Sequence, residues 1–284
     1  MVRSLWTGAT GMIAQQLNVD NISNNLANVN TTGYKSEAME FKSLLYQTVQ
    51  TKTTTANGEN KPIGAEVGLG VRNSSITSIF TQGSLLESSG PANFAIDGNG
   101  FFGIRGDDGN TYYTRNGAFN WATSTSGGVV LANSEGGNNG MTLTTSDGLP
   151  VLNSSGEPIV LDSDAVVSKV TISKDGTLYY PDDKGNPQSL GITIGLWQFN
   201  NPAGLSKEGD SLYSVTSASG AAMNEASNTN LTKSSLKQGY LEGSNVQIAD
   251  EMVNLIVAQR AYEMNSKVIT TSDEMLQQAN QLKR

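Results

Sequence analysis

The sequence predicts an α+β fold, in which the two chain termini form one discontinuous coiled-coil domain of helices and the middle forms an all-β domain. Near both ends, apolar residues recur every seven positions, which is the repeat of a helix seam. In the middle, short apolar runs alternate with Gly-containing turns, a pattern typical of strands joined by hairpins. We expect four parts: an N-terminal helix in 1–45, an extended connector in 46–85, the all-β domain in 86–225, and a return segment with the C-terminal helix in 226–284.

The N-terminal heptads are formed by Leu5, Met12, Val19 and Leu26, and they predict one amphipathic helix of about four heptads. Asn is a poor helix former, and residues 18–30 are rich in it. Such a helix is only marginally stable without tertiary or quaternary contacts. We therefore expect the chain ends to be disordered in the free subunit and to become ordered in an assembly.

The C-terminal helix repeats the seven-residue pattern at five positions: Ile248, Leu255, Tyr262, Ile269 and Leu276. Ser244 or Asn245 is predicted to cap its start, because such side chains accept hydrogen bonds from the first free N–H groups of a helix. Asp250 and Glu251 suit the positive end of the helix dipole.

The apolar faces of the two helices could pack against each other in a monomer or against other chains. Residues 18–33 carry one charged side chain, Asp20, whereas a solvated helix face normally carries many. This favours assembly, with side-chain amides hydrogen-bonded across helix contacts. The predicted assembly interface therefore adds four residues to the nine heptad positions: Trp6, Asn24, Asn25 and Asn28.

The central β domain is predicted from its turn signals and the runs between them. Four dipeptides are expected at hairpin tips: Asp108-Gly109, Asn116-Gly117, Asp175-Gly176 and Gly185-Asn186. Residues 50–66 before this domain are rich in Thr, Asn and Gly and keep no periodicity, which indicates a flexible or extended connection.

Composition excludes most catalytic chemistry. The chain has no Cys and no His, so it lacks disulfides, metal sites built on these residues and imidazole-dependent triads. Gly98, Gly100 and Gly103 match a dinucleotide-binding spacing, but a strand-like run follows in place of a helix. Paired acids such as Asp107 and Asp108 are typical of surface turns. We expect no enzyme activity, no cofactor and no metal.

The net charge and the hydropathy argue against nucleic acid and the membrane interior as binding partners. The net charge is −8, and residues 86–225 hold 15 acidic and 6 basic side chains, which argues against nucleic acid. The chain has no run of 18 apolar residues, so we expect no direct membrane insertion. The N-terminus lacks the continuous apolar run of a cleaved secretory signal.

The motifs at both ends resemble the family of flagellar basal-body rod and hook proteins. The resemblance rests on SLWTGATGMIAQQLNVDNISNNLANVNTTGYK at the N-terminus and LEGSNVQIADEMVNLIVAQRAYEMNSKVITTSDEMLQQ at the C-terminus. Three internal runs add to it: FAIDGNGFF, YYTRNGAF and NPAGLSKEGDSLY. It covers nearly the whole chain. The stretch 121–145 departs from the family pattern by being rich in Asn and Gly, which affects only the expected strand register there.

This resemblance implies a structural subunit that leaves the cell through the flagellar export apparatus without a cleaved signal. It implies a homo-oligomer, a helical tubular assembly with a central channel that the terminal helices line, located in the periplasmic part of the basal body. Implied partners are proximal rod proteins, the hook protein, and the peptidoglycan and outer-membrane ring proteins. The β domain would form the outer layer of the tube.

Within the family, EFKSLLYQTVQ followed by IGAEVGLGV, together with the modest length, favours the members that form the distal rod. A hook subunit or a proximal rod subunit is the alternative. Two other classes stay open from the residues alone: a secreted β-rich adhesin and a carboxylate-dependent glycosidase acting on the cell wall. An adhesin gives no reason for the paired terminal heptads.

Overall fold

In the computed structural model the chain forms two compact units, which we describe separately. The first combines residues 1–27, 37–79 and 246–284, and the second combines residues 28–36 and 80–245. The structure describes residues 2–50, 64–123, 140–161, 165–182, 186–228 and 231–282. Most of the segment 50–66 and most of the stretch 121–145 therefore lie outside the described residues. The four-part division expected from the sequence stays a prediction.

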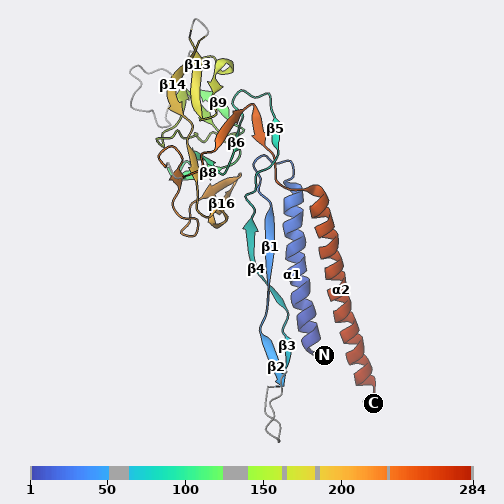
Figure 1. Ribbon diagram of the computed structural model, residues 1–284. Helices are drawn as coiled ribbons and strands as arrows, with labels where there is room; N and C mark the ends of the chain where they lie inside the picture. Colours follow the sequence, from blue (N-terminus) through green and yellow to red (C-terminus); the bar gives the residue numbers. More distant parts are fainter. Residues whose placement is uncertain are drawn as a thin grey trace. The chain divides into compact units, whose positions relative to one another are not determined.

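The first unit consists of two helices and a β-ribbon. Its elements are α1 (Val2–Ala27), β1 (Glu37–Ser43), β2 (Tyr46–Gln50), β3 (Ala65–Gly68), β4 (Val71–Ser78) and α2 (Ile248–Gln281). The two helices lie side by side, blue and red in Figure 1. Two terminal helices and a β-rich middle confirm the α+β class, whereas a coiled coil in the strict sense stays a prediction.

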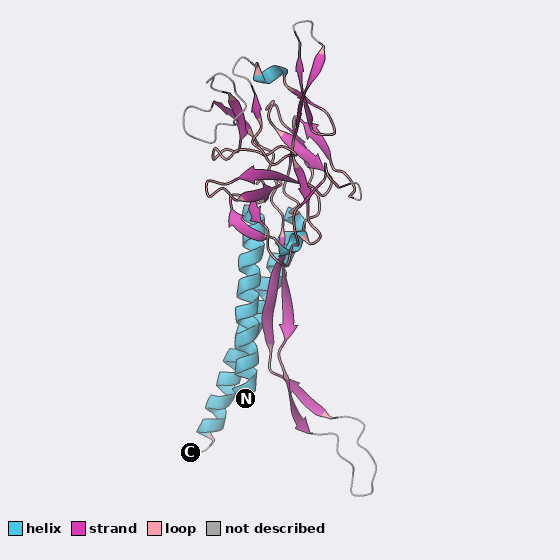
Figure 2. Cartoon of the chain, turned by 90° about the vertical axis from the view of Figure 1, so that its left-hand side faces the viewer, coloured by secondary structure: helices cyan, strands magenta, loops and turns pink. Residues whose placement is uncertain are grey.

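The ribbon is one long pair of antiparallel strands built from two hairpin sections, β1 with β4 and β2 with β3. Two backbone hydrogen bonds join the sections: the Leu44 N–H donates to the Gly70 carbonyl at 2.9 Å, and the Leu69 N–H donates to the Leu45 carbonyl at 3.2 Å. Figure 2 shows the ribbon as two successive pairs of magenta strands. The N-terminal helix thus ends at Ala27, and strand structure follows well before residue 45.

The predicted side-chain cap of α2 is wrong. The cap residue is Gln247, whose side chain makes no capping hydrogen bond. The Asn245 side chain is used elsewhere, since its Oδ1 accepts a hydrogen bond from the Ser36 N–H at 2.7 Å. The placement of Asp250 and Glu251 in the first turn of α2 is confirmed.

In its described residues, the second unit is all β apart from two short 3-10 turns, η1 (Val167–Lys169) and η2 (Pro202–Gly204). Its largest sheet has the strand order β16-β17-β8-β7-β15-β18. Smaller sheets have the orders β11-β10-β9 and β12-β13-β14, and two further pairs join β19 with β6 and β20 with β5. The strands are β5 (Leu85–Glu87), β6 (Phe94–Asp97), β7 (Phe101–Arg105), β8 (Thr111–Thr114), β9 (Asn120–Thr123), β10 (Met141–Thr144), β11 (Val160–Leu161), β12 (Thr171–Ile172), β13 (Thr177–Pro181), β14 (Pro187–Thr193), β15 (Leu196–Gln198), β16 (Ser206–Gly209), β17 (Leu212–Ser214), β18 (Met223–Asn224), β19 (Ser235–Gln238) and β20 (Tyr240–Glu242).

Two of the four expected hairpin tips are confirmed. Asp108-Gly109 connects the paired strands β7 and β8, and Asp175-Gly176 connects β12 and β13. Asn116-Gly117 is not a hairpin tip, because β8 and β9 belong to different sheets. There the Phe94 N–H donates to the Gly117 carbonyl at 3.0 Å, which ties this segment to the start of β6. Gly185 of the fourth tip lies outside the described residues.

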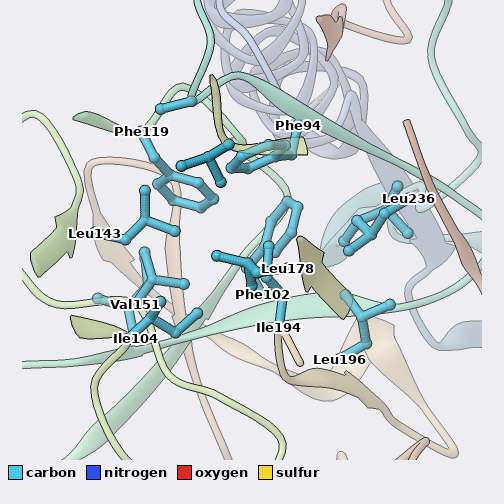
Figure 3. Close-up of a cluster of buried hydrophobic side chains, with 14 of the residues drawn as sticks. Phe94, Phe102, Ile104, Phe119, Leu143, Val151, Leu178, Ile194, Leu196 and Leu236 are labelled. Atoms are coloured by element: carbon cyan, nitrogen blue, oxygen red, sulfur yellow. The ribbon is translucent and has the colours of Figure 1, made fainter. Parts of the chain in front are cut away.

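The core of the second unit is formed by apolar side chains from many of these strands (Figure 3). Phe102, Ile104, Leu143 and Leu178 are each fully buried at its centre. A second cluster is mainly aromatic, and its rings meet edge to face; its members are Phe101, Tyr113, Leu152, Trp197, Phe199, Leu205 and Tyr213. Core packing accounts for most of the aromatic residues of the middle.

Two leucines on neighbouring strands test this core. Leu178→Ala on β13 removes a side chain with 0% exposure, so we expect unfolding free energy to fall by about 2–5 kcal/mol. Leu190→Ala on β14, where the side chain is 40% exposed, should cost less than about 1 kcal/mol. Urea unfolding followed by Trp fluorescence measures both. Equal losses in the two variants would contradict the assigned core.

Candidate assembly surface of the terminal helices

The contact between α1 and α2 is built on residues without large side chains. A Cβ added at Gly8 would lie 2.9 Å from Cγ1 of Ile269, and one added at Gly11 would lie 2.7 Å from Nδ2 of Asn265. Both distances are shorter than carbon and nitrogen atoms tolerate. Gly8 therefore gives the Ile269 side chain the room it occupies, and Gly11 does the same for the side-chain amide of Asn265.

The same face of α1 continues with small residues in both directions. Ser4 lies one turn before Gly8, and its Oγ is 3.1 Å from Oγ of Ser272 on α2. Ala14 on α1 and Ala258 on α2 are both buried, at 2% and 1% exposure. The part of α1 from Ser4 to Ala14 that packs within the unit thus includes several small residues, whereas Ile22 further along the helix buries a large apolar side chain.

Asn25 closes this contact at the other end of α1. Its Nδ2 donates to the Glu37 carbonyl at 2.9 Å, its Oδ1 accepts from the Glu37 N–H at 2.9 Å, and Nδ2 also lies 3.2 Å from Oε1 of Glu251. Asn21 donates a further hydrogen bond to the Glu37 carbonyl at 3.0 Å. One amide, itself 1% exposed, thereby holds α1, β1 and α2 together.

Burial raises the pKa of the Glu251 carboxyl in this environment. The hydrogen bond from Asn25 opposes the shift, and the negative charge of Asp250 adds to it. The partly desolvated carboxylate of Glu251 thus lies against the Asn25 amide, which also pairs with the backbone of β1.

Large apolar side chains stay exposed on other sides of both helices. On α1 they are Trp6, Ile13 and Leu17, spaced seven and four residues apart. On α2 a row follows the spacing 4, 7, 4, 7 and therefore lies along one side of the helix; its members are Val253, Val257, Met264, Val268 and Met275. We call these eight residues the outer apolar stripes. Exposed apolar surface of this extent marks interaction sites.

The predicted interface residues fall into three groups in the isolated chain. Asn25 is buried. Seven of the heptad residues and Asn28 are half-buried, namely Leu5, Met12, Val19, Leu26, Leu255, Ile269 and Leu276. Four are exposed, namely Trp6, Asn24, Ile248 and Tyr262. The structure brings Ile269 against α1 and Asn25 against α2. The role of the whole set in assembly stays a prediction.

Sequence reasoning missed the residues at the centre of the helix contact. It placed the seam of α1 on Leu5, Met12, Val19 and Leu26, whereas the closest approach to α2 is at Gly8 and its neighbours. A signal was present, because Ser4, Gly8 and Gly11 follow the spacing 4 and 3 of a helix seam. Small residues in a heptad register carry no hydropathy, so a search for apolar periodicity passes over them.

No other site of known chemistry emerges from the described residues. The Gly98 to Gly103 run passes directly into strand β7, without the helix that a dinucleotide site needs. Among the described residues there is no group of three metal-ligating side chains, and no helix is long and apolar enough to cross a membrane. Asp162 and Asp164, one of the acid pairs, lie outside them.

Comparison with known proteins identifies the family. A protein from Borreliella burgdorferi, named flagellar basal-body rod protein FlgG, is 42% identical over 286 residues, with 100% of both chains covered. The chain belongs to the family of flagellar basal-body rod proteins. Proteins of the same name from Agrobacterium fabrum (43% over 278 residues; 96% of this chain, 97% of the relative) and Bacillus subtilis (38% over 289 residues; 100% of both) are also similar to this rod protein.

Three family models match separate parts of this rod protein. They are described as flagella basal body rod protein (residues 5–35), flagellar hook protein FlgE/F/G D1 domain (95–180) and flagellar basal body rod FlgEFG protein C-terminal (237–282). The two terminal matches include most of α1 and all of α2, so the elements that meet in the first unit are those that characterise the family. The resemblance inferred from the motifs is thereby confirmed.

A disulfide test addresses the helix contact, since the natural chain has no Cys. In the double variant Ser4→Cys with Ser272→Cys, the two sulfurs would replace hydroxyls 3.1 Å apart, so we expect an intramolecular disulfide under mild oxidation. The purified chain is oxidised and run on a non-reducing gel. Trp6→Cys with Ser272→Cys is the control, because Trp6 points away at 68% exposure. Crosslinking of the control pair alone, or of neither pair, would contradict the contact.

Proposed function

We propose that this protein is a structural subunit of the distal rod of the bacterial flagellum. In this proposal it self-assembles through its terminal helices into a hollow cylinder and transmits torque from the motor to the hook, without catalytic activity. Similarity to flagellar basal-body rod proteins over the whole chain supports this function. The structural observation that carries it is the pair of outer apolar stripes, whose side chains are 43–68% exposed in the single chain.

The stripes supply the driving force for assembly. Burial of apolar surface is worth about 25 cal/mol for each square ångström, and side chains such as Val257 and Met264 are more than half exposed in the single chain. A second copy that presents an apolar helix face would remove this surface from water. Because the stripes of α1 and α2 differ, the contact is heterologous and propagates into a helical array.

The predicted interface residues acquire two different roles in this proposal. Those at the contact between α1 and α2, such as Asn25 and Ile269, shape the helix pair that each copy presents. Those with exposed side chains, such as Trp6, Ile248 and Tyr262, add to the contact with neighbouring copies. Stiff helix packing at interior density would then carry torque along the cylinder.

The proposed location is the periplasmic part of the basal body, after export without a cleaved signal. Proposed partners are the proximal rod proteins, the hook protein, the ring proteins of the peptidoglycan and outer membrane, and the export apparatus. The acidic surface of the middle of the chain is proposed to make only weak contacts with the surrounding rings, as rotation requires. The segment 50–66 is proposed to pack against neighbouring copies and to restrict bending.

The alternative is a hook or proximal rod subunit, and the match of residues 95–180 does not separate the two, because that model is described for FlgE, FlgF and FlgG together. Electron microscopy of basal bodies from a strain that lacks the gene separates the two. A rod that stops before the outer ring supports the distal rod. An intact rod that lacks only its hook supports the alternative and overturns the proposal.

A charged residue in the outer apolar stripes tests assembly itself. Val257 is 62% exposed in the single chain, so Val257→Asp should leave both units folded. In a copy-to-copy contact it would bury an unpaired carboxylate, and we expect at least about tenfold less polymer. Sedimentation measures polymer, and circular dichroism confirms the fold. Gln259→Asp, at an exposed polar position of the same helix, is the matched control. Normal polymerisation of Val257→Asp would remove the stripe from the interface.

A further inference from the structure

In the second unit, two buried cationic side chains pair with one buried carboxylate. Nζ of Lys35 lies 2.6 Å from Oε1 of Glu242, and Nη1 of Arg115 lies 3.3 Å from Oε2. All three residues are at most 2% exposed. The guanidinium of Arg115 also lies 5.0 Å from the ring centroid of Phe101, a cation–π distance.

Backbone groups also bind Glu242 and Lys35. The Gly83 N–H donates to Oε1 of Glu242 at 3.0 Å, and Nζ of Lys35 donates to the Thr81 carbonyl at 2.8 Å. The Gly33 N–H donates to the carbonyl of Glu242 at 2.8 Å. The carboxylate and the ammonium group are thus each satisfied by groups from more than one segment of the chain.

Neighbouring side chains bind the same segments to each other. The side chain of Asn245 accepts from the Ser36 N–H and donates to Oγ1 of Thr81 at 2.9 Å. The hydroxyl of Thr32 donates to Oδ1 of Asn116 at 2.9 Å. Three stretches that lie far apart in the sequence therefore share one hydrogen-bonded cluster: 28–36, 80–84 and 240–245.

These stretches are the places where the chain passes between its two units. The chain enters or leaves the second unit after Ala27, Ser36, Ile79 and Asn245. Lys35, Thr81 and Asn245 themselves lie within two residues of the last three of these points. One buried cluster therefore holds the second-unit ends of the connecting segments.

The charges make this arrangement cooperative. Burial lowers the pKa of Lys35, and the attraction of Glu242 opposes that shift. A buried carboxylate that loses one cationic partner retains the free-energy cost of desolvation. It no longer has the full electrostatic attraction that offset this cost. Release of any one segment therefore weakens the hold on the other two.

We propose that Lys35, Glu242 and Arg115 form a clamp that makes the segments 28–36, 80–84 and 240–245 open and close as one unit. The connecting segments then cannot loosen independently. The clamp is a property of the folded chain and needs no assembly, whereas its use, to carry torque between the units through anchored segments, rests on the proposed function.

Hydrogen exchange of the wild-type chain gives the first test. With increasing denaturant below the unfolding midpoint, amides of the three segments should converge on one opening free energy and one denaturant dependence. Three different opening energies would overturn the clamp. This measurement needs no variant, so it stays decisive if a substitution prevents folding.

Lys35→Met gives the second test. Because it removes one partner of a buried ion pair, exchange should accelerate at least about a hundredfold in all three segments together. Lys237→Met is the matched control, since Lys237 pairs with Asp97 at 2.9 Å while both side chains are 44% exposed. The amides of the Lys237→Met variant should exchange at the same rates as those of the wild type. Acceleration confined to 28–36, or an equal effect of Lys237→Met, would overturn the proposal.

Both exchange experiments use the purified chain and are independent of polymerisation. A chain that passes them but never assembles would leave the clamp standing and remove the proposed function. A chain that assembles and drives motility while its three segments exchange independently would overturn the clamp and leave the proposed function standing. The two hypotheses therefore fail on different observations.

Discussion

The first unit depends on how closely α1 approaches α2. Gly8 and Gly11 allow that approach, and it leaves room only for small or polar side chains between the helices. Polar groups buried there must be paired, and Asn25 achieves this by bonding to the backbone of β1 and to Glu251 at once. Because several inner positions are held by small residues, many of the large apolar side chains of both helices, such as Trp6 and Val257, stay exposed. The same constraint that forms the pair therefore supplies surface for assembly.

The second unit depends on an apolar core and on a cluster of buried charged side chains. Its apolar core is conventional, with fully buried residues such as Phe102 and Leu178. The segments by which the chain enters and leaves this unit are held by buried charged groups. The Lys35 ammonium group donates a hydrogen bond to the Glu242 carboxylate, and the two residues are 207 positions apart in the sequence. A subunit that carries mechanical load through several chain crossings benefits from such anchoring, because flexible linkers would absorb the rotation instead of transmitting it. The exposed helix faces suit association, and the anchored connecting segments suit stiffness. Both features fit a structural component.

The sequence predicted the elements better than their faces and partners. Heptads placed α1 correctly, because four repeats of Leu5, Met12, Val19 and Leu26 leave little choice of secondary structure. They could not tell which side of the helix packs inward, since glycine at positions 8 and 11 has no hydropathy to contribute. The β-ribbon was missed as a pairing, because the residues between β1 and β4 keep no periodicity and were interpreted as a connector, although they contain the hairpin dipeptide Asn57-Gly58. Lys35 was visible only as a motif residue and Asn245 was expected to cap α2, since the partners of both side chains are fixed by tertiary contacts alone.

The most direct test is a helical reconstruction of the assembled polymer at side-chain resolution. The account predicts that Gly8 and Gly11 face Asn265 and Ile269 of the same chain, while Val257 and Met264 lie against a neighbouring copy. A polymer in which α1 packs on the α2 of another chain, or in which those two outer side chains face water, would contradict it.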